Sequence, residues 1–152
     1  MKKQNKQENS ESAVKSITLK NSQIKILSAF IDIPLHSLKA RSRNIIYKLI
    51  NPALQEYETE RMKLVQKYGS KNKDGELEFI DEEKTQFKIE DTEKFEKAFT
   101  KLRDIEIVFD ILPSNKEAWK VTKQIVEETK AEFTVADTIV WEELLESLTI
   151  KK

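Results

Sequence analysis

The chain has 152 residues, of which 36% are charged and 38% are apolar, and its formal net charge is zero. This length predicts one domain with a modest core under a densely ionic surface. The chain contains no cysteine, which excludes disulfides and thiolate zinc sites, and it has no apolar run approaching the roughly 20 residues that cross a bilayer.

The first fifteen residues are polar and charged. Residues 1–15 consist mainly of Lys, Gln, Asn, Glu and Ser, which cannot bury enough apolar surface to offset the entropy lost on ordering. We therefore expect a disordered tail over 1–15 and a single domain over 16–152. The tail also lacks the apolar segment of a secretory signal, so secretion is not indicated.

A short strand and a helix are predicted next. Polar and apolar side chains alternate over residues 16–20, which is typical of a strand. Asn21 or Ser22 can cap a helix that continues to Asp32. Pro34 ends this helix, because a proline pushes the residue before it out of the helical region.

Residues 37–69 contain one long amphipathic pattern, in which apolar side chains recur mostly at steps of three or four. Pro52 interrupts the pattern without changing its phase, so we expect a kink rather than two helices. A helix over 40–68 would be about 44 Å long against a domain width of roughly 30 Å, so it must bend or project. We expect Gly69 to end it in the left-handed conformation that glycine adopts without a Cβ penalty.

Residues 70–81 allow two interpretations. Oxygen-bearing side chains at the first, third, fifth and twelfth positions, with glycine at the sixth, resemble a calcium loop. Such a loop requires an acidic first ligand and a glutamate at the twelfth position, but serine and aspartate stand there and two lysines add positive charge. We favour a hairpin turn at 71–75, with a second hairpin pairing between 77–80 and 86–89.

Four more elements are expected in the rest of the chain. Asp91 or Thr92 starts a helix. Residues 105–112 are apolar and rich in β-branched side chains, which predicts a largely buried strand. A capping box that begins at Ser114 opens the next helix, and Thr134 caps the last one in a similar way.

Together these elements predict an α+β fold that is mostly helical. A long kinked central helix would be accompanied by three or four shorter helices packed on a small β-sheet. The sheet would contain the strands at 16–20 and 105–112, with the hairpin as a third candidate member.

The charges are divided unevenly along the chain. Residues 1–68 carry 13 Lys and Arg against 6 Asp and Glu, a net +7, and residues 69–152 carry 14 against 21, a net −7. A basic segment in the first half could contact phosphates or an acidic partner, and it consists of Lys39, Arg41, Arg43 and Lys48. No nucleic-acid-binding motif accompanies it, so we favour the interpretation that the two halves pack on each other.

No group of residues points to catalysis. His36 is the only histidine, and a surface or core position is more common for such a residue than a role as a base. With only Gly69 and Gly75, the chain has neither a phosphate-binding glycine loop nor a nucleophile elbow. We expect no enzymatic activity, no catalytic or metal-binding residue and no cofactor. Trp119 and Trp141 could anchor a partner, although we favour core positions for them.

Several short motifs follow one another along residues 15–150. They are Ile17-Thr18-Leu19, Tyr57-Glu58 with Arg61, Tyr68-Gly69, Asp74-Gly75, Phe87-Lys88-Ile89, Asp91 with Phe95, Leu102 with Ile105-Glu106-Ile107, and Leu144-Leu145-Glu146-Ser147-Leu148. Their order and spacing resemble a family of small uncharacterised proteins of temperate phages and prophages of Gram-positive bacteria, from which the charged tail departs. The resemblance implies a phage-encoded protein made in the bacterial host cytoplasm. It brings no catalytic residue and no assigned activity.

We therefore expect a non-catalytic binding protein whose partner is a protein, either a phage assembly component or a host or defence factor. The binding surface would lie along the long helix and the acidic C-terminal half. The alternative is a nucleic-acid-binding accessory protein that uses the basic segment around 39–48. A homo-oligomer is also considered, because a projecting apolar helix needs cover, and no membrane partner is expected.

Overall fold

The computed structural model describes residues 15–31, 33–129 and 131–149, so all of the predicted tail except Lys15 lies outside the described residues. The elements are β1 (Ser16–Lys20), α2 (Asn21–Ser28), α3 (Ser37–Tyr68), α4 (Thr92–Arg103), β2 (Glu106–Asp110), α5 (Lys116–Glu128) and α6 (Val135–Ser147). The predicted α+β fold, mostly helical with one long helix and a small sheet, is confirmed.

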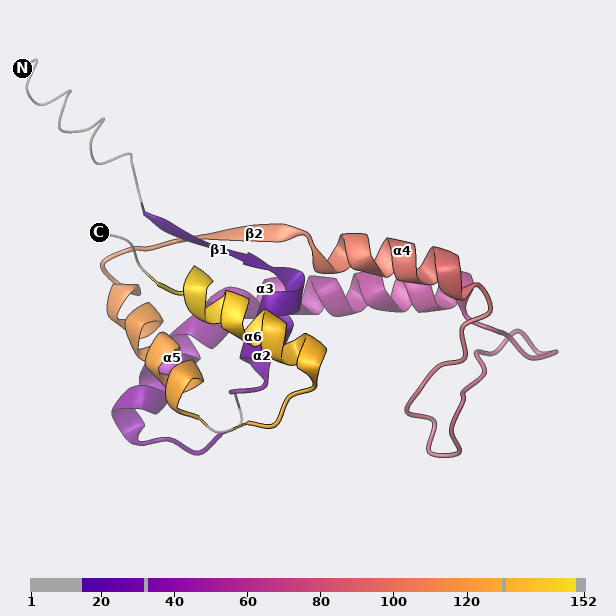
Figure 1. Cartoon of the computed structure of the whole chain (residues 1–152), viewed down its shortest axis with the longest axis horizontal. Coiled ribbons are helices and arrows are strands. Elements are labelled where there is room, and N and C mark those ends of the chain that lie inside the picture. The colour runs from indigo at the N-terminus through magenta and orange to yellow at the C-terminus, as the bar shows by residue number, and fades with distance from the viewer. Residues whose placement is uncertain (1–14, 32, 130, 150–152) are drawn as a thin grey trace, which may run out of the picture.

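The long helix α3 organises the molecule. It runs through Pro52 without a break, and Figure 1 shows that its two halves point in different directions. The missing N–H of proline and the crowding of the preceding turn explain a bend at this point. The first half packs against α5 and the second against α4, so one helix contacts both ends of the molecule.

The sheet has two antiparallel strands, with Ile17 opposite Phe109 and Leu19 opposite Ile107. These side chains face the helices, whereas Val108 points to the outer face and is 60% exposed. The prediction of a largely buried second strand was therefore wrong. A two-stranded sheet that packs on helices has one covered face and one solvated face, so alternate residues of β2 remain in water.

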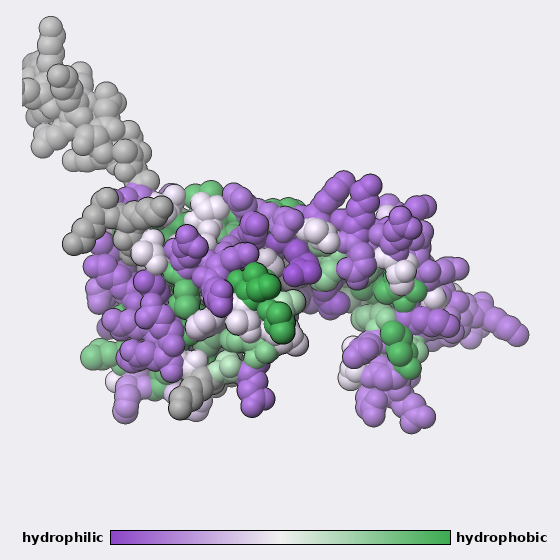
Figure 2. All heavy atoms as spheres, in the orientation of Figure 1, coloured by the Kyte–Doolittle hydropathy of each residue, from purple (hydrophilic) through white to green (hydrophobic). Residues whose placement is uncertain are grey.

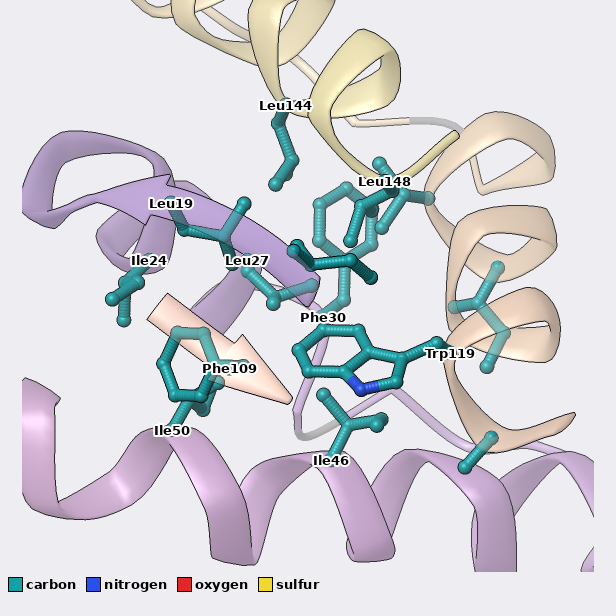
Figure 3. Packing of buried hydrophobic residues seen from close by; sticks show 14 residues of the cluster. Leu19, Ile24, Leu27, Phe30, Ile46, Ile50, Phe109, Trp119, Leu144 and Leu148 are labelled. Atoms are coloured by element: carbon teal, nitrogen blue, oxygen red, sulfur yellow. The ribbon is translucent and has the colours of Figure 1, made fainter. Parts of the chain in front are cut away.

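The core lies between the sheet and the bend of α3. Trp119 is fully buried at its centre and packs against Phe109 with ring centroids 5.7 Å apart (Figure 3). Ile46 and Ile50 approach from α3, and Leu144 lies on the side of α6 (Figure 3). Because Trp119 has no exposed surface, it cannot anchor a partner, and the core position favoured for it is confirmed.

The segment between α3 and α4 forms a lobe that extends away from the core (Figure 1). The predicted turn is confirmed by pairing of Lys71 with Leu77, but this hairpin and the Phe79–Phe87 pairing stay apart from the β1–β2 sheet. Three short stretches close a ring of backbone hydrogen bonds, in which Ser70 N–H donates to Lys88 (2.8 Å), Lys88 N–H to Glu78 (2.9 Å) and Glu78 N–H to Ser70 (2.9 Å). This ring satisfies backbone groups that the sheet does not reach.

Gly69 ends α3 for a reason other than the predicted one. Its φ is −74° and its ψ is 147°, so the residue is extended rather than left-handed. A Cβ at this position would overlap the carbonyl oxygen of Val65 and lie 2.8 Å from the Leu77 side chain. Glycine is favoured here because the last turn of α3, and secondly the Leu77 side chain of the lobe, leave no room for a Cβ.

The helix caps were predicted with mixed success. Asp91 accepts a hydrogen bond from Lys94 N–H (3.1 Å), and Thr134 caps α6 in the same way, as expected. The capping box at Ser114 was wrong, because α5 begins after Asn115, whose side chain instead bonds the backbone of the preceding loop. Helix α2 also ends at Ser28, four residues earlier than predicted, in a turn that places Phe30 in the core.

Candidate interaction surface

The four cations of the predicted basic segment do not share one surface. Lys39 pairs with Glu128 on α5 (3.1 Å), and Arg43 donates to the carbonyl oxygens of Phe30 and Ile33. On a helix with 3.6 residues per turn, Arg41 and Lys48 lie on the opposite side of α3 from Lys39 and Arg43, and both are exposed. The structure therefore divides the segment into a pair that holds neighbouring elements and a pair that faces solvent.

The two oppositely charged halves do pack on each other, but they do so mainly through apolar side chains. The core cluster takes Ile17, Ile46 and Ile50 from the basic half and Phe109 and Trp119 from the acidic half. Of the ion pairs among the described residues, only the one between Lys39 and Glu128 joins the halves. Most of each charge excess therefore remains at the surface.

Trp141 is half-buried and fixes α6 to α5. Its indole N–H donates to the carbonyl oxygen of Val126 (3.2 Å), and its ring contacts Phe133 with centroids 6.4 Å apart. The side chain is thus already engaged on both its polar and its apolar parts. Neither tryptophan is presented to solvent as a partner anchor.

A groove of about 420 Å³ lies where α2, α3, α4 and α6 meet, and we call it the α3–α6 groove. Aromatic rings from α3 and α4, charged side chains and a short apolar stretch of α6 line it. Its lining residues are Ser22, Lys25, Ile26, Tyr57, Glu58, Arg61, Phe99, Arg103, Ala136, Asp137 and Val140. The groove combines the long helix with the acidic C-terminal half, which are the two regions expected to bind a partner.

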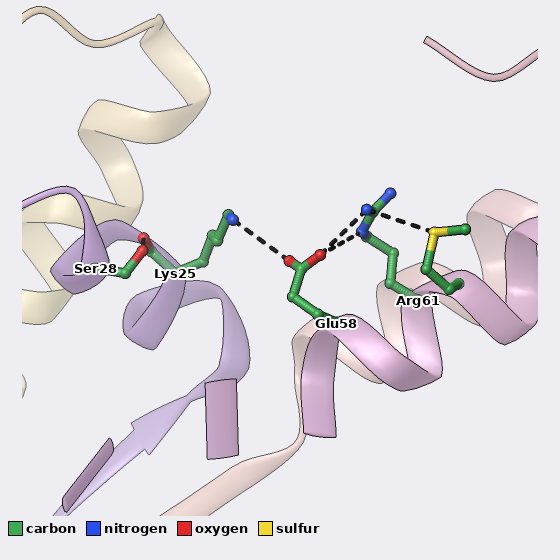
Figure 4. A network of polar contacts seen from close by, with 5 residues as sticks. Lys25, Ser28, Glu58 and Arg61 are labelled. Atoms are coloured by element: carbon green, nitrogen blue, oxygen red, sulfur yellow. Dashed lines mark hydrogen bonds and ion pairs between the residues drawn. The ribbon is translucent and has the colours of Figure 1, made fainter. Parts of the chain in front are cut away.

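A charge network forms one wall of this groove. Glu58 accepts from Lys25 of α2 (3.4 Å) and from both Nε (3.2 Å) and Nη2 (3.1 Å) of Arg61, as Figure 4 shows. Burial alone would raise the pKa of Glu58, but the charges of Arg61 and Lys25 and their hydrogen bonds hold that pKa below its ordinary value. The carboxylate therefore stays ionised, and its ion pair with Lys25 links α2 to α3.

The floor of the groove is aromatic. Tyr57 stacks on Phe99 with ring centroids 6.3 Å apart, and the guanidinium of Arg103 lies over Phe99 at 5.8 Å. Burial raises the pKa of the Tyr57 phenol, against the opposing influence of Arg103, so this tyrosine is neutral at physiological pH. A flat aromatic floor beside fixed charges suits recognition of a side chain that has an apolar body and a polar end.

Helix α6 contributes Ala136, Asp137 and Val140 to the groove, and on another side it carries apolar side chains that no other described residue covers. We call these exposed side chains, Val135 and Ile139, the α6 rim. Val135 is 82% exposed and Ile139 is 54% exposed, on the side of α6 turned away from buried Leu144. A hydrophobic area over α6 stands out among polar neighbours in Figure 2. Apolar residues of α6 therefore occur outside the stripe that packs on the core, so α6 has more apolar surface than the described residues cover.

The arrangement suits binding and offers no reactive pair. His36 is exposed at the start of α3, far along the chain from the groove residues, and its side chain makes no cap hydrogen bond. Within residues 15–31, 33–129 and 131–149, no three His, Cys, Asp or Glu side chains cluster in a way that could hold a metal ion. In the same part of the chain, no helix combines the length and the apolar character needed to span a membrane.

The sequence motifs include Glu58 and Arg61, which are neighbours on one helix, but sequence reasoning did not assign them to a binding site. Lys25 was not identified, because it meets Glu58 only when α2 packs on α3. The rim could have been found. Apolar residues occur on every side of α6, and the pattern at Val135 and Ile139 departs from the single stripe of an ordinary surface helix.

Comparison with known proteins places the chain in a family and goes no further. Neither the curated proteins nor the solved structures contain a match to it. A family described as "Protein of unknown function (DUF1617)" matches residues 15–152, which takes in every element of the fold described above. The chain belongs to this family, DUF1617.

Proposed function

We propose that this protein is a non-catalytic, phage- or prophage-encoded binding protein that docks a protein partner on the rim of α6 and in the adjoining α3–α6 groove. The observation that carries the proposal is the exposure of Val135 and Ile139 on α6, where they form an apolar step bordered by the exposed Glu142 and Glu146. Exposed apolar side chains on a helix that also lines a charged groove are typical of a protein interface, where an apolar centre is bordered by polar groups.

Burial of the α6 rim would contribute most of the binding free energy, and the charges of the groove would orient the partner. Complete burial of an aliphatic side chain contributes about 1.5–3 kcal/mol, so covering Val135 and the exposed half of Ile139 contributes about 2–4 kcal/mol. Lys25, Arg61 and Arg103 line the groove against Glu58 and Asp137, so a partner meets charges that are already fixed in position. Such complementarity governs orientation and choice of partner more than affinity.

The biological setting is part of the proposal. The family match confirms the expectation of an uncharacterised family, while phage origin, a Gram-positive host and the host cytoplasm are implied by the resemblance of the sequence motifs. Small phage proteins without catalytic residues often act by binding, which is an analogy at the level of protein class. A phage assembly component or a host or defence factor is the expected partner.

The test is affinity capture of the tagged chain from phage-infected or prophage-carrying Gram-positive cells, with and without nuclease. The wild type should retain a protein partner after nuclease treatment, and the Val135→Asp/Ile139→Asp variant should lose it. Leu38→Asp is the matched control, because Leu38 is 80% exposed at the start of α3. Equal recovery of the partner with all three proteins would overturn the proposal.

Two further measurements separate this function from its alternatives. A nucleic-acid-binding protein should lose affinity for DNA or RNA steeply with salt and again on charge reversal at Arg41 and Lys48, the exposed pair of the basic segment. Light scattering of the purified protein reports self-association. A dimer that dissociates in the Val135→Asp/Ile139→Asp variant would assign the rim to a second copy of this chain.

A further inference from the structure

The outer edge of β2 is a second surface, distinct from the α3–α6 groove. The register pairs Ile17 with Phe109, and flanking bonds run from Ile111 N–H to Lys15 (2.8 Å) and from Asn21 N–H to Ile105 (3.0 Å). Hydrogen-bonded pairs alternate along an antiparallel ladder, so the odd-numbered residues of β2 bond to β1. The backbone groups of its even-numbered residues therefore point away from β1.

These outward-pointing groups form an open strand edge. They belong to Glu106, Val108 and Asp110, and the side chain of Asn115 confirms the direction by donating to the Asp110 carbonyl oxygen (3.2 Å). Asn115 occupies one end of the edge and leaves the N–H and C=O groups of Glu106 and Val108 open within the described structure. The sheet runs along the upper side of the molecule in Figure 1, and no labelled element lies above it. An open edge of this kind accepts an additional strand.

The edge itself carries carboxylates, while the nearest cations, Lys20 opposite Glu106 and Lys15, belong to the β1 side of the outer face. Glu106 and Asp110 flank exposed Val108 on the outer face of the strand. Beneath the edge, Glu56 and Glu60 of α3 line a small hollow of about 110 Å³ together with side chains of β2. Lys63 pairs with Glu60 (2.9 Å), whereas none of the ion pairs among the described residues includes Glu56, Glu106 or Asp110.

The hollow and the α3–α6 groove share Tyr57 but otherwise use different flanks of α3. Glu56 and Glu60 are four residues apart and share one flank of the helix, while Glu58 and Arg61, which line the groove, lie on the other. The two surfaces can therefore be changed independently. A variant of the α6 rim leaves the β2 edge intact.

We propose that the β2 edge binds an extended, basic segment of another protein by strand addition. A strand paired with this edge places alternate side chains on the outer face, opposite Glu106, Val108 and Asp110. The complementary pattern is basic–x–apolar–x–basic, and it reads the same in both strand directions. Backbone hydrogen bonds hold the segment, and the carboxylates select the basic side chains.

The same charges exclude a second copy of this chain. Two antiparallel copies of β2 centred on Val108 would set Glu106 of each copy against Asp110 of the other. Like charges directly opposite one another destabilise a strand pair. Charged side chains at an open edge are a common means of preventing such self-pairing.

The probe is a fluorescent peptide of sequence Thr-Lys-Thr-Val-Thr-Lys-Thr, with Thr-Glu-Thr-Val-Thr-Glu-Thr as its charge-reversed counterpart. Anisotropy titrations of the full chain should show binding of the lysine peptide, weakened by salt, and at least about tenfold weaker binding of the glutamate peptide. The Glu106→Lys/Asp110→Lys variant should reverse this preference. The Val135→Asp/Ile139→Asp variant should bind the lysine peptide as the wild type does.

A backbone variant tests the strand addition itself. Val108→Pro removes an N–H that β1 does not use, so proline is tolerated there, and affinity for the lysine peptide should fall by about tenfold. Thr18→Pro removes the corresponding N–H from the open edge of β1 and should leave peptide binding unchanged. Circular dichroism verifies that both proline variants fold. If either proline variant is unfolded, the peptide preference of Glu106→Lys/Asp110→Lys tests the proposal instead.

Three results would overturn the proposal. The first is no binding of the lysine peptide at concentrations up to about 1 mM, the weakest affinity of interest. The second is equal affinity for the two peptides. The third is a wild-type dimer that Val108→Pro abolishes, which would show that the edge pairs with a second copy of this chain.

Discussion

Replacement of Trp119 by phenylalanine tests the account of the core most sharply, because two opposing effects nearly cancel. The indole is fully buried, and its N–H has no hydrogen-bond partner among the described residues. An unsatisfied buried donor costs about 1–3 kcal/mol, and Trp119→Phe removes that cost. The smaller ring forfeits about 1 kcal/mol of apolar burial and about 1 kcal/mol through the cavity that it leaves.

The expected change in the free energy of unfolding for Trp119→Phe is therefore within about 1 kcal/mol of zero. Trp141→Phe is the matched control, because it removes a similar volume together with a hydrogen bond to Val126 that is made (3.2 Å). Trp141→Phe should therefore be the more destabilising by about 1 kcal/mol, although Trp141 is the less buried side chain. Trp119→Ala removes the whole ring and should cost about 3–5 kcal/mol.

Urea denaturation followed by far-ultraviolet circular dichroism measures each value, and an unchanged m-value shows that the unfolded states are comparable. The reasoning is refuted if Trp119→Phe costs more than about 2.5 kcal/mol while Trp141→Phe costs less, because burial area alone would then explain both results.

Three further predictions concern the lobe and the groove wall. Gly69→Ala should destabilise the chain by about 1–3 kcal/mol, measured by thermal unfolding, because the added Cβ overlaps the carbonyl oxygen of Val65 in α3; a neutral result would mean that the end of α3 adjusts freely to remove this overlap. In the lobe, Lys84 has a φ of 58° and Gly75 a φ of 81°, a region of backbone conformation that favours glycine. In thermal unfolding, Lys84→Gly should therefore stabilise the chain by about 0.5 kcal/mol, and Gly75→Ala should destabilise it by about 1 kcal/mol. If both variants changed the stability in the same direction, the positive φ angles would be contradicted. Glu58 has a lowered pKa in the folded state, so its ion pairs contribute above the ordinary value of 4.5 and are lost as the pH falls through the lower folded value. At neutral pH the melting temperature of Glu58→Gln should therefore lie below that of the wild type, by an amount equivalent to about 0.5–1 kcal/mol for these partly exposed ion pairs. This difference in melting temperature should disappear below pH 4.5. A difference that stays constant with pH would show that the ion pairs of Glu58 are not its cause.

Much of the fold could be predicted because its determinants are close together in the chain. The apolar spacing of α3 and the side-chain caps at Asp91 and Thr134 involve residues within one turn of each other. The predictions failed where a distant segment intervened. Gly69 is extended where the backbone after α3 pairs with residues 88–90, and Ser114 does not cap α5, where Asn115 bonds to the end of β2.

The candidate surfaces were harder to predict than the elements that carry them. The basic segment was grouped by its position in the sequence, but Arg43 is directed at the α2–α3 connection and Lys39 at α5. The groove is lined by four helices, and Lys25 meets Glu58 only when α2 packs on α3. The open edge of β2 depends on pairing with a strand that ends almost ninety residues earlier in the chain.

The sequence by itself determined the helical content, the order of the elements, the continuity of α3 through Pro52 and the division of charge between the halves. These properties depend on periodicity and on contacts across three or four residues, which neighbouring side chains specify directly. Only the tertiary structure decided that Trp119 is buried while Val108, Val135 and Ile139 are exposed. Burial depends on which distant surfaces meet, and each of these side chains is equally apolar whether or not another element covers it.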